Sequence, residues 1–266
     1  MKGQSALFAG VSWMVWWSYS TAVAAESPEH SATKAVIHQA YTHHFGSIDP
    51  PQINVNEWGR VGLPFVKELS QAERAQEMER EHLRTPKQQE RATDAIGPSR
   101  HGVPIYTHFL GSDEPGSDRW GTRDTILKLL ALFDGWAEHC RNELPSTISE
   151  ARPETCTVQV GDLGWYNDTT PDPLGHTDHY RGTCTDLRLF RDDGSRYEAW
   201  WNRPDERPEA KGGYSRALTG AFLAFAAQYH PPSVLYFNDP ALISTVPGLE
   251  ASPGHDDHIH LCFETR

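Results

Sequence analysis

The sequence predicts an α+β domain in which helices flank a small, mostly antiparallel sheet. Two segments, 122–141 and 215–229, carry apolar residues at helical spacing. Several short runs have the composition or the alternation of strands: 157–160, 185–190, 234–237 and the tail from 258 onward. Helices and strands do not alternate regularly along the chain, which favours α+β over a parallel α/β architecture.

The length and the net charge of the chain limit the number of domains and the classes of partner that it can bind. The chain has 266 residues, 38% of them hydrophobic and nine of them Trp, which is enough for one large domain, or for one domain plus an extension. The net charge of −12 argues against general affinity for nucleic acid or for anionic membrane surfaces. It does not describe any single cleft, so it leaves the substrate open.

Residues 1–25 have the pattern of a signal peptide for export. A lysine is followed by a mostly apolar run and then by the small-residue cleavage pattern Ala22-Val23-Ala24-Ala25. Cleavage there would release a mature chain whose four cysteines meet an oxidising compartment, where disulfides persist. The alternative is an uncleaved membrane anchor, which Trp13, Trp16 and Trp17 would support.

Residues 26–100 are polar and poorly periodic, and we interpret them as an N-terminal extension of unassigned role. The stretch 69–92 is rich in Glu, Gln and Arg and could form a solvated helix. His43 and His44 have no carboxylate or cysteine at ligand spacing, so we expect both side chains to be exposed to solvent without a functional role. The compact domain is expected to occupy 101–266.

Each predicted helix of this domain has one apolar face. Thr122 can cap the first helix, which is expected to run to about Arg141. Its apolar stripe is expected to pack in the core: Leu129, Phe133, Trp136 and Cys140. The second helix, about 215–229, has a similar stripe: Leu218, Phe222, Phe225 and Tyr229. A Gly-, Asp- and Pro-rich loop, 164–175, separates the first strand from the second.

Histidines gather in the tail and again near residue 180. His258 and His260 alternate with Ile259 and Leu261, so both imidazoles are expected on one face of a strand, with the apolar pair buried behind them. A His-x-His pair alone is more often an ordinary strand surface than a metal site. The second cluster, in 175–186, makes the signal stronger.

The two clusters together supply a plausible set of metal ligands. His179 and Asp186 are seven residues apart across a turn, so a loop histidine and a strand aspartate can face the same space. His260 would complete a His-Asp-His set. Catalytic zinc typically keeps three protein ligands and a water, so we expect this set to bind Zn2+. A structural zinc is the alternative, although such sites usually have four protein ligands and favour cysteine.

The remaining histidines have expected roles around this set. Zinc lowers the pKa of a bound water toward about 7. His258, on the same strand face as His260, is placed to accept or stabilise the released proton as a general base. His176 and His255 each precede a cluster histidine by three residues, which suits side chains that orient the ligands or hold the substrate.

These motifs resemble those of the penicillin-insensitive murein endopeptidases. This family belongs to a wider group of zinc peptidases that includes lysostaphin-type enzymes, D-Ala-D-Ala carboxypeptidases and the hedgehog signalling domain. The resemblance covers roughly 117 to the end of the chain. The matching segments are Arg119-Trp120-Gly121, Gly161-Asp162, the spaced residues His176, His179, Gly182 and Asp186, Phe237-Asn238-Asp239-Pro240, and Gly254-His255-Asp256-Asp257-His258-Ile259-His260.

The resemblance implies a periplasmic zinc endopeptidase that cleaves peptide cross-bridges of peptidoglycan, at D-alanyl–diaminopimelate or related bonds. It implies His179, Asp186 and His260 as zinc ligands, and His258 as the catalytic histidine. His176 and His255 would be further active-site residues. A metal-activated water would attack the carbonyl, with no covalent enzyme intermediate. The partner would be the peptidoglycan peptide, and the mature chain is expected to have no membrane span.

Two positions depart from the family pattern. Cys184 and Cys262 stand where the family has an Asp and an Arg, which leaves the substrate specificity open. If Asp186 and His260 lie on neighbouring strands, the two cysteines share their face and lie within bridging reach. We therefore expect a Cys184–Cys262 disulfide, and a second one between Cys140 and Cys156. The alternative is that Cys184 contributes to the metal site.

Two other functions stay open. A zinc D,D- or L,D-carboxypeptidase would trim the stem peptides of peptidoglycan, but no single arginine in the sequence identifies itself as the group that captures a free carboxylate. A wall-binding protein would keep the zinc site without turnover. The presence of His258 beside three ligands argues against a pure binder, which needs no base.

Overall fold

A computed structural model describes residues 27–46, 53–64, 95–98, 100–101, 103–107, 119–164, 179–194, 199–203 and 213–263. The helices are α1 (Pro28–Phe45), α4 (Arg123–Asn142), α5 (Arg216–Tyr229) and α6 (Pro240–Ile243), with short 3-10 turns η1 (Leu144–Ser146) and η2 (His179–Arg181). The strands are β1 (Val61–Gly62), β2 (Ala95–Pro98), β3 (Pro104–Thr107), β4 (Trp120–Gly121), β5 (Val158–Val160), β6 (Cys184–Arg188), β7 (Val234–Tyr236) and β8 (His258–Cys262).

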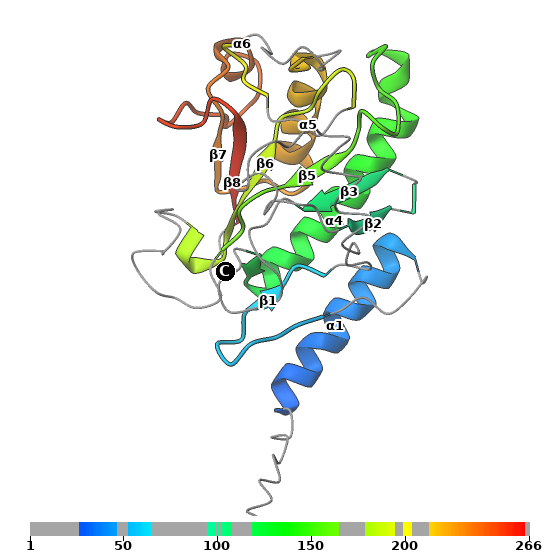
Figure 1. Cartoon of the computed structure of the whole chain (residues 1–266), viewed down its shortest axis with the longest axis vertical. Coiled ribbons are helices and arrows are strands. Elements are labelled where there is room, and N and C mark those ends of the chain that lie inside the picture. The colour runs from blue at the N-terminus through cyan, green and yellow to red at the C-terminus, as the bar shows by residue number, and fades with distance from the viewer. Residues whose placement is uncertain are drawn as a thin grey trace, which may run out of the picture.

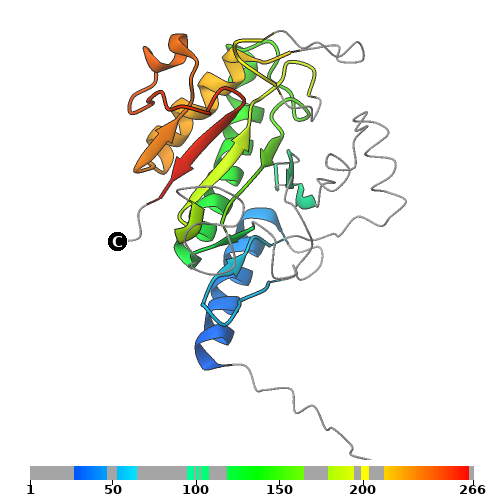
Figure 2. The same ribbon diagram turned by 60° about the vertical axis from the view of Figure 1, so that its left-hand side comes forward.

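The main sheet has six strands in the order β2-β3-β5-β6-β8-β7. Only the β3–β5 pair is parallel, and the other four pairs are antiparallel. The chain is therefore an α+β domain with a mostly antiparallel sheet, as the sequence predicts. Figures 1 and 2 show α4 and α5 on one side of β5, β6 and β8.

Helix α4 begins where the sequence predicts. The Thr122 side chain accepts a hydrogen bond from the backbone N–H of Thr125 and so satisfies one free donor of the first turn. The predicted stripe is fully buried: Leu129, Phe133, Trp136 and Cys140. The ring of Trp136 packs 5.2 Å from the rings of Phe190 and Phe222, so this helix joins α5 to the sheet.

Helix α5 differs from its prediction at one end. Ser215 caps it, and Leu218 and Phe222 are buried as expected. Phe225 is only partly buried, and Tyr229 is 48% exposed. The last turn of the helix therefore lies outside the core, and the ring of Tyr229 stacks on that of Phe225.

The described parts of the N-terminal region pack against the domain. In α1, Ile37, Tyr41 and Phe45 are buried at intervals of four residues, on the face that meets α4 (Figure 1). Strand β1 pairs with β4, and β2 pairs with β3 in the main sheet. The boundary expected at residue 101 thus lies between two paired strands, and the segment interpreted as an extension contributes to the core.

His44 differs from the expectation of a solvent-exposed side chain without a role. Its Nδ1 lies 3.0 Å from Oδ2 of Asp134, a carboxylate buried on α4. Arg100 Nη2 lies 3.1 Å from the same oxygen, so α1 and the β2–β3 turn are both held to α4 by one charged group. His43 is exposed, as expected.

Four other predictions lie outside the described residues: the signal segment 1–25, the helix over 69–92, the loop 164–175 except for its first residue, and His176. Within the described part of the chain, every helix is too short or too polar to span a bilayer.

Candidate metal centre

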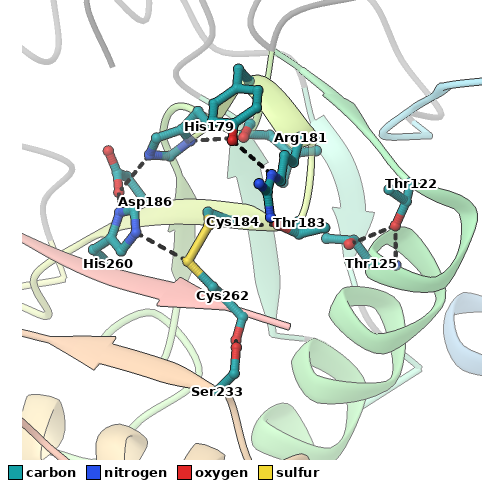
Figure 3. Close-up of a disulfide and its surroundings, with 12 residues drawn as sticks. Thr122, Thr125, His179, Arg181, Thr183, Cys184, Asp186, Ser233, His260 and Cys262 are labelled. Atoms are coloured by element: carbon teal, nitrogen blue, oxygen red, sulfur yellow. Dashed lines mark hydrogen bonds and ion pairs between the residues drawn. A yellow bond between two sulfur atoms is a disulfide. The ribbon is translucent and has the colours of Figure 1, made fainter. Parts of the chain in front are cut away.

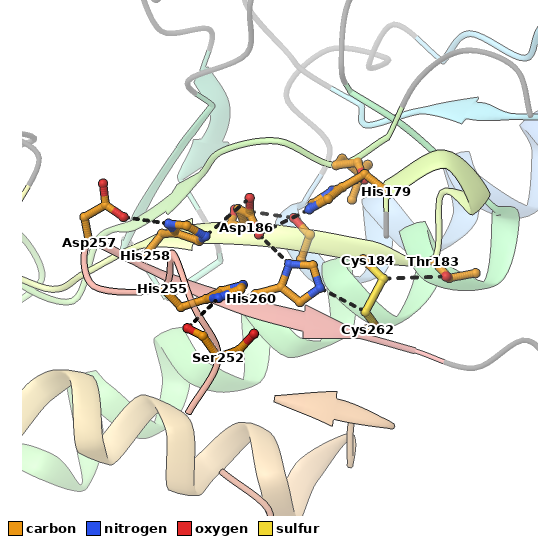
Figure 4. A network of polar contacts seen from close by, with 12 residues as sticks. His179, Thr183, Cys184, Asp186, Ser252, His255, Asp257, His258, His260 and Cys262 are labelled. Atoms are coloured by element: carbon orange, nitrogen blue, oxygen red, sulfur yellow. Dashed lines mark hydrogen bonds and ion pairs between the residues drawn. A yellow bond between two sulfur atoms is a disulfide. The ribbon is translucent and has the colours of Figure 1, made fainter. Parts of the chain in front are cut away.

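The register of β6 and β8 brings the two histidine clusters together. Asp186 lies directly opposite His260 across the antiparallel pair, and Cys184 lies opposite Cys262. Alternate residues of a strand point to opposite faces of a sheet. Ile259 and Leu261 are buried in the core, as predicted, so Asp186 and His260 point to the other face of the sheet (Figure 4).

His179 reaches this face from η2, the turn that leads into β6. Gly182 ends the turn with φ of +63°, a conformation that L side chains rarely adopt. A Cβ at Gly182 would also collide with the guanidinium of Arg60. The ring of His179 is oriented by the backbone, because its Nδ1–H donates to the carbonyl oxygen of Leu163 over 2.7 Å.

Three buried side chains converge on one point. Asp186 Oδ1 lies 2.8 Å from Nδ1 of His260 and 3.3 Å from Nε2 of His179. The three ligand atoms all lie within 4.8 Å of one another, so this group can hold a metal ion. These are the three residues for which the sequence predicts that role.

The protonation of these groups indicates that the point attracts positive charge. Burial alone would lower the pKa of His179, but its hydrogen bond to Asp186 and the charge of that carboxylate raise it to about 9. Burial would likewise raise the pKa of Asp186, but hydrogen bonds from His179 and His260, together with the neighbouring histidine charges, hold it well below its usual range.

The donor set suits a metal ion for a further reason. Since Nδ1 of His179 gives its hydrogen to Leu163, the Nε2 of the neutral ring presents a lone pair to the Asp186 carboxylate. In the metal-free protein the raised pKa of His179 favours a proton on Nε2, between these two atoms 3.3 Å apart, and a metal ion can take the place of that proton. Nitrogen and oxygen donors of this kind bind zinc and other first-row divalent metals.

His258 lies at the edge of the same site. Its Nδ1 is 2.7 Å from Oδ1 of Asp257, and its Nε2 is 3.8 Å from the second oxygen of Asp186. The side chain is 28% exposed, so a molecule arriving from solvent can reach it. Burial alone would lower the pKa of His258, but the hydrogen bond to Asp257 and the charge of Asp186 raise it.

His255 belongs to the same group of rings. Its centroid lies 4.9 Å from that of His258 and 5.3 Å from that of His260. Its Nδ1 lies 3.1 Å from two carbonyl oxygens, those of Ser252 and Pro253, so this nitrogen is the donor. Burial and the charge of His258 lower the pKa of His255, which favours the neutral ring.

Besides the contact between Asp257 and His258 described above, sequence reasoning missed the contacts of two further residues near these histidines. Tyr236 on β7 stacks on His260 at 5.8 Å and packs against His255 at 5.4 Å. Asp256 accepts hydrogen bonds from the side chains of Trp201 and Asn238, and so holds the segment 199–203 against the tail loop. Tyr236 is found only through the pairing of β7 with β8, and an acidic residue between histidines gives no signal of what it binds.

Both predicted disulfides are present: Cys140–Cys156 and Cys184–Cys262 (Figure 3). The second joins residues that face each other on β6 and β8. The neighbouring backbone bond, from the N–H of Phe263 to the oxygen of Thr183, puts the cysteines at a non-hydrogen-bonded position, where opposed side chains come closest. Because its sulfur is bonded to Cys262, Cys184 is not a metal ligand in this form of the protein.

Comparison of the sequence with models of protein families finds no match, and comparison with curated proteins also finds none. The resemblance to murein endopeptidases therefore rests on the sequence motifs alone.

Proposed function

We propose that the protein is an exported zinc metallopeptidase that hydrolyses peptide cross-bridges of peptidoglycan, as the motif resemblance implies. The observation that carries this proposal is the convergence of His179, Asp186 and His260 on one point, with His258 beside them. Three protein ligands leave the fourth position of a tetrahedral ion for water or substrate, which is the arrangement of catalytic zinc.

Zinc in this position would polarise the scissile carbonyl and lower the pKa of a water molecule. His179 would hold the ion through Nε2, Asp186 through a carboxylate oxygen, and His260 through Nδ1. The hydrogen bond from His179 to Leu163 fixes its ring and makes Nε2 the available donor.

His258 has the position of a proton acceptor. It is partly exposed, and its Nδ1 contacts Asp257, which orients the ring and stabilises the imidazolium. The opposite nitrogen, Nε2, faces the ligand carboxylate of Asp186. It would take the proton from the attacking water and return it to the leaving amine.

Two observations support the proposed compartment. Both disulfides persist most readily in an oxidising environment, such as the periplasm. The N-terminal segment has the pattern of a cleaved export signal. Together with the motif resemblance, they favour peptidoglycan as the substrate.

Cross-linked muropeptide dimers provide the test. The mature chain, zinc-loaded or EDTA-treated, is incubated with dimers, and the products are identified by mass spectrometry. The proposal predicts zinc-dependent conversion of dimers to monomers. Release of a single terminal alanine would instead identify a carboxypeptidase. No cleavage by a chain that holds zinc would reject the peptidoglycan endopeptidase and leave either a binding protein or an enzyme whose substrate lies outside the wall.

A further inference from the structure

His260 faces two sets of donor atoms, one on each side of its ring. Nδ1 faces Asp186 at 2.8 Å and belongs to the centre described above. Nε2 faces the other way and lies 3.2 Å from Sγ of Cys262, one half of the disulfide (Figures 3 and 4). The candidate donor atoms of Cys184, His260 and Cys262 also lie within 4.8 Å of one another.

We propose that reduction of the Cys184–Cys262 disulfide creates a second metal site, formed by the two thiolates and Nε2 of His260. Two thiolates and an imidazole are a donor set that zinc prefers, and the thiolates are softer donors than the carboxylate of the first set. In the oxidised protein the sulfurs are bonded to each other, so only the first set is available.

The two sites exclude each other because they share one ring. A neutral imidazole carries one lone pair and one N–H, so it binds a metal through Nδ1 or through Nε2 but not through both. When Nε2 binds the metal, Nδ1 carries the hydrogen and donates it to Asp186. The first set is then reduced to two ligands, His179 and Asp186.

The chemistry of the switch balances with an external dithiol as reductant. The dithiol supplies two electrons and two protons, the sulfur–sulfur bond breaks to give two cysteine thiols, and the reductant becomes a disulfide. The thiols lose their protons to solvent when they bind the metal. Cys184 and Cys262 are 4% and 7% exposed, whereas both residues of the other disulfide are 0% exposed, so the disulfide between the strands is the more accessible of the two.

Metal binding by His179, Asp186 and His260 would then depend on whether the Cys184–Cys262 disulfide is oxidised or reduced. In a reducing compartment the metal would occupy the thiolate site and withdraw His260 from the set with Asp186. Formation of the disulfide would release His260 to that set. Only this consequence for activity rests on the proposed function; the second site itself rests on the geometry of three side chains.

Cobalt binding tests the second site without any substrate. The full chain is reduced by a dithiol, which is then removed in the absence of oxygen, and Co2+ is added. The expected result is a thiolate-to-cobalt charge-transfer band in the near ultraviolet, absent from the oxidised protein. The matched variant, in which Cys184→Ser and Cys262→Ser are combined, keeps the other disulfide and is expected to show no band in either state.

Single histidine substitutions then test the shared ring. His179→Ala damages only the first set, so the reduced variant is expected to keep the band, whereas reduced His260→Ala is expected to lose it or to need more Co2+ to reach it. Alkylation with mass analysis reports which cysteines are reduced. Reduced Cys184 and Cys262 without the band, resistance of this disulfide to the dithiol, or an unchanged band in His260→Ala would each overturn the proposal.

Discussion

Among the single residues, metal binding and proton transfer are assigned to different side chains. Asp186 contacts both His179 and His260, whereas His258 reaches only the second carboxylate oxygen, at 3.8 Å. His258 is therefore assigned to the reaction rather than to the ion. Substitutions at these positions are expected to have different consequences for zinc content and for turnover.

His258→Ala is expected to keep one zinc per chain and to lose hydrolysis by about 10²- to 10⁴-fold in kcat, the usual contribution of a general base. Zinc content and muropeptide cleavage, measured on the same preparation, check this. His38→Ala, at an exposed position of α1, is the matched control and should leave both unchanged. Full activity of His258→Ala would contradict the assigned role.

The pH dependence of the metal-free protein follows from His179. Its pKa of about 9 in the folded chain lies above the ordinary value of 6.5. Its contribution to stability is thus fully present below pH 6.5 and is lost as the pH rises through 9. The loss is on the order of 3 kcal/mol, because one pKa unit corresponds to about 1.4 kcal/mol.

Urea unfolding of the EDTA-treated chain between pH 6 and 10 measures this loss. In His179→Gln the decline attributable to this group should disappear. In the zinc-loaded chain it should also disappear, because the metal replaces the proton on His179. An equal decline in the metal-free wild type and in His179→Gln would show that another group causes it.

Most of the candidate site could be predicted from the sequence, because the spacing of residues along a strand determines which side chains share a face. The His-x-His alternation fixes which face of β8 the imidazoles share, and the cysteines two residues from Asp186 and His260 must then oppose each other. Tyr236 and Asp256 could not be predicted, since their contacts depend on pairing with β7 and on a loop that arrives from residues 199–203.

At the scale of elements, the helices with a broad apolar face could be predicted, and α1 could not. Helix α4 buries ten residues over its length, whereas α1 buries only Ile37, Tyr41 and Phe45 among polar neighbours. Three apolar residues give a weak periodic signal. Strands of two residues, such as β1 and β4, give none, because only their pairing identifies them.

Ile37→Ala tests whether α1 contributes to the core. Ile37 is fully buried, so its truncation is expected to lower the free energy of unfolding by about 2–5 kcal/mol. The neighbouring Val36 is 42% exposed, and Val36→Ala should change stability by less than about 0.5 kcal/mol. Equal, small effects of both substitutions on urea unfolding would show that α1 does not pack on α4.

In the molecule as a whole, one disulfide and the candidate metal centre join parts that are distant in sequence. The Cys184–Cys262 bond closes a separation of 78 residues and holds β6 to β8, the two strands that carry Asp186 and His260. A metal ion held by these residues and by His179 would add a further link. Both links act on the same pair of strands.

Zinc removal should therefore destabilise the entire domain. A ligand that binds only the folded state stabilises it by about 4 kcal/mol when present at a thousand times its dissociation constant. The melting temperature of the zinc-loaded chain should exceed that of the EDTA-treated chain, and the difference should vanish in Asp186→Ala. Equal melting temperatures of the two wild-type samples would contradict this.

The zinc content of the oxidised chain after equilibrium dialysis tests whether His179, Asp186 and His260 are the metal ligands. We expect one zinc per chain in the wild type, and loss of that zinc in Asp186→Ala and in His260→Ala. His38→Ala should retain it. A wild type that binds no zinc, or a His260→Ala variant that retains a full equivalent, would contradict the assignment of His179, Asp186 and His260 as the metal ligands.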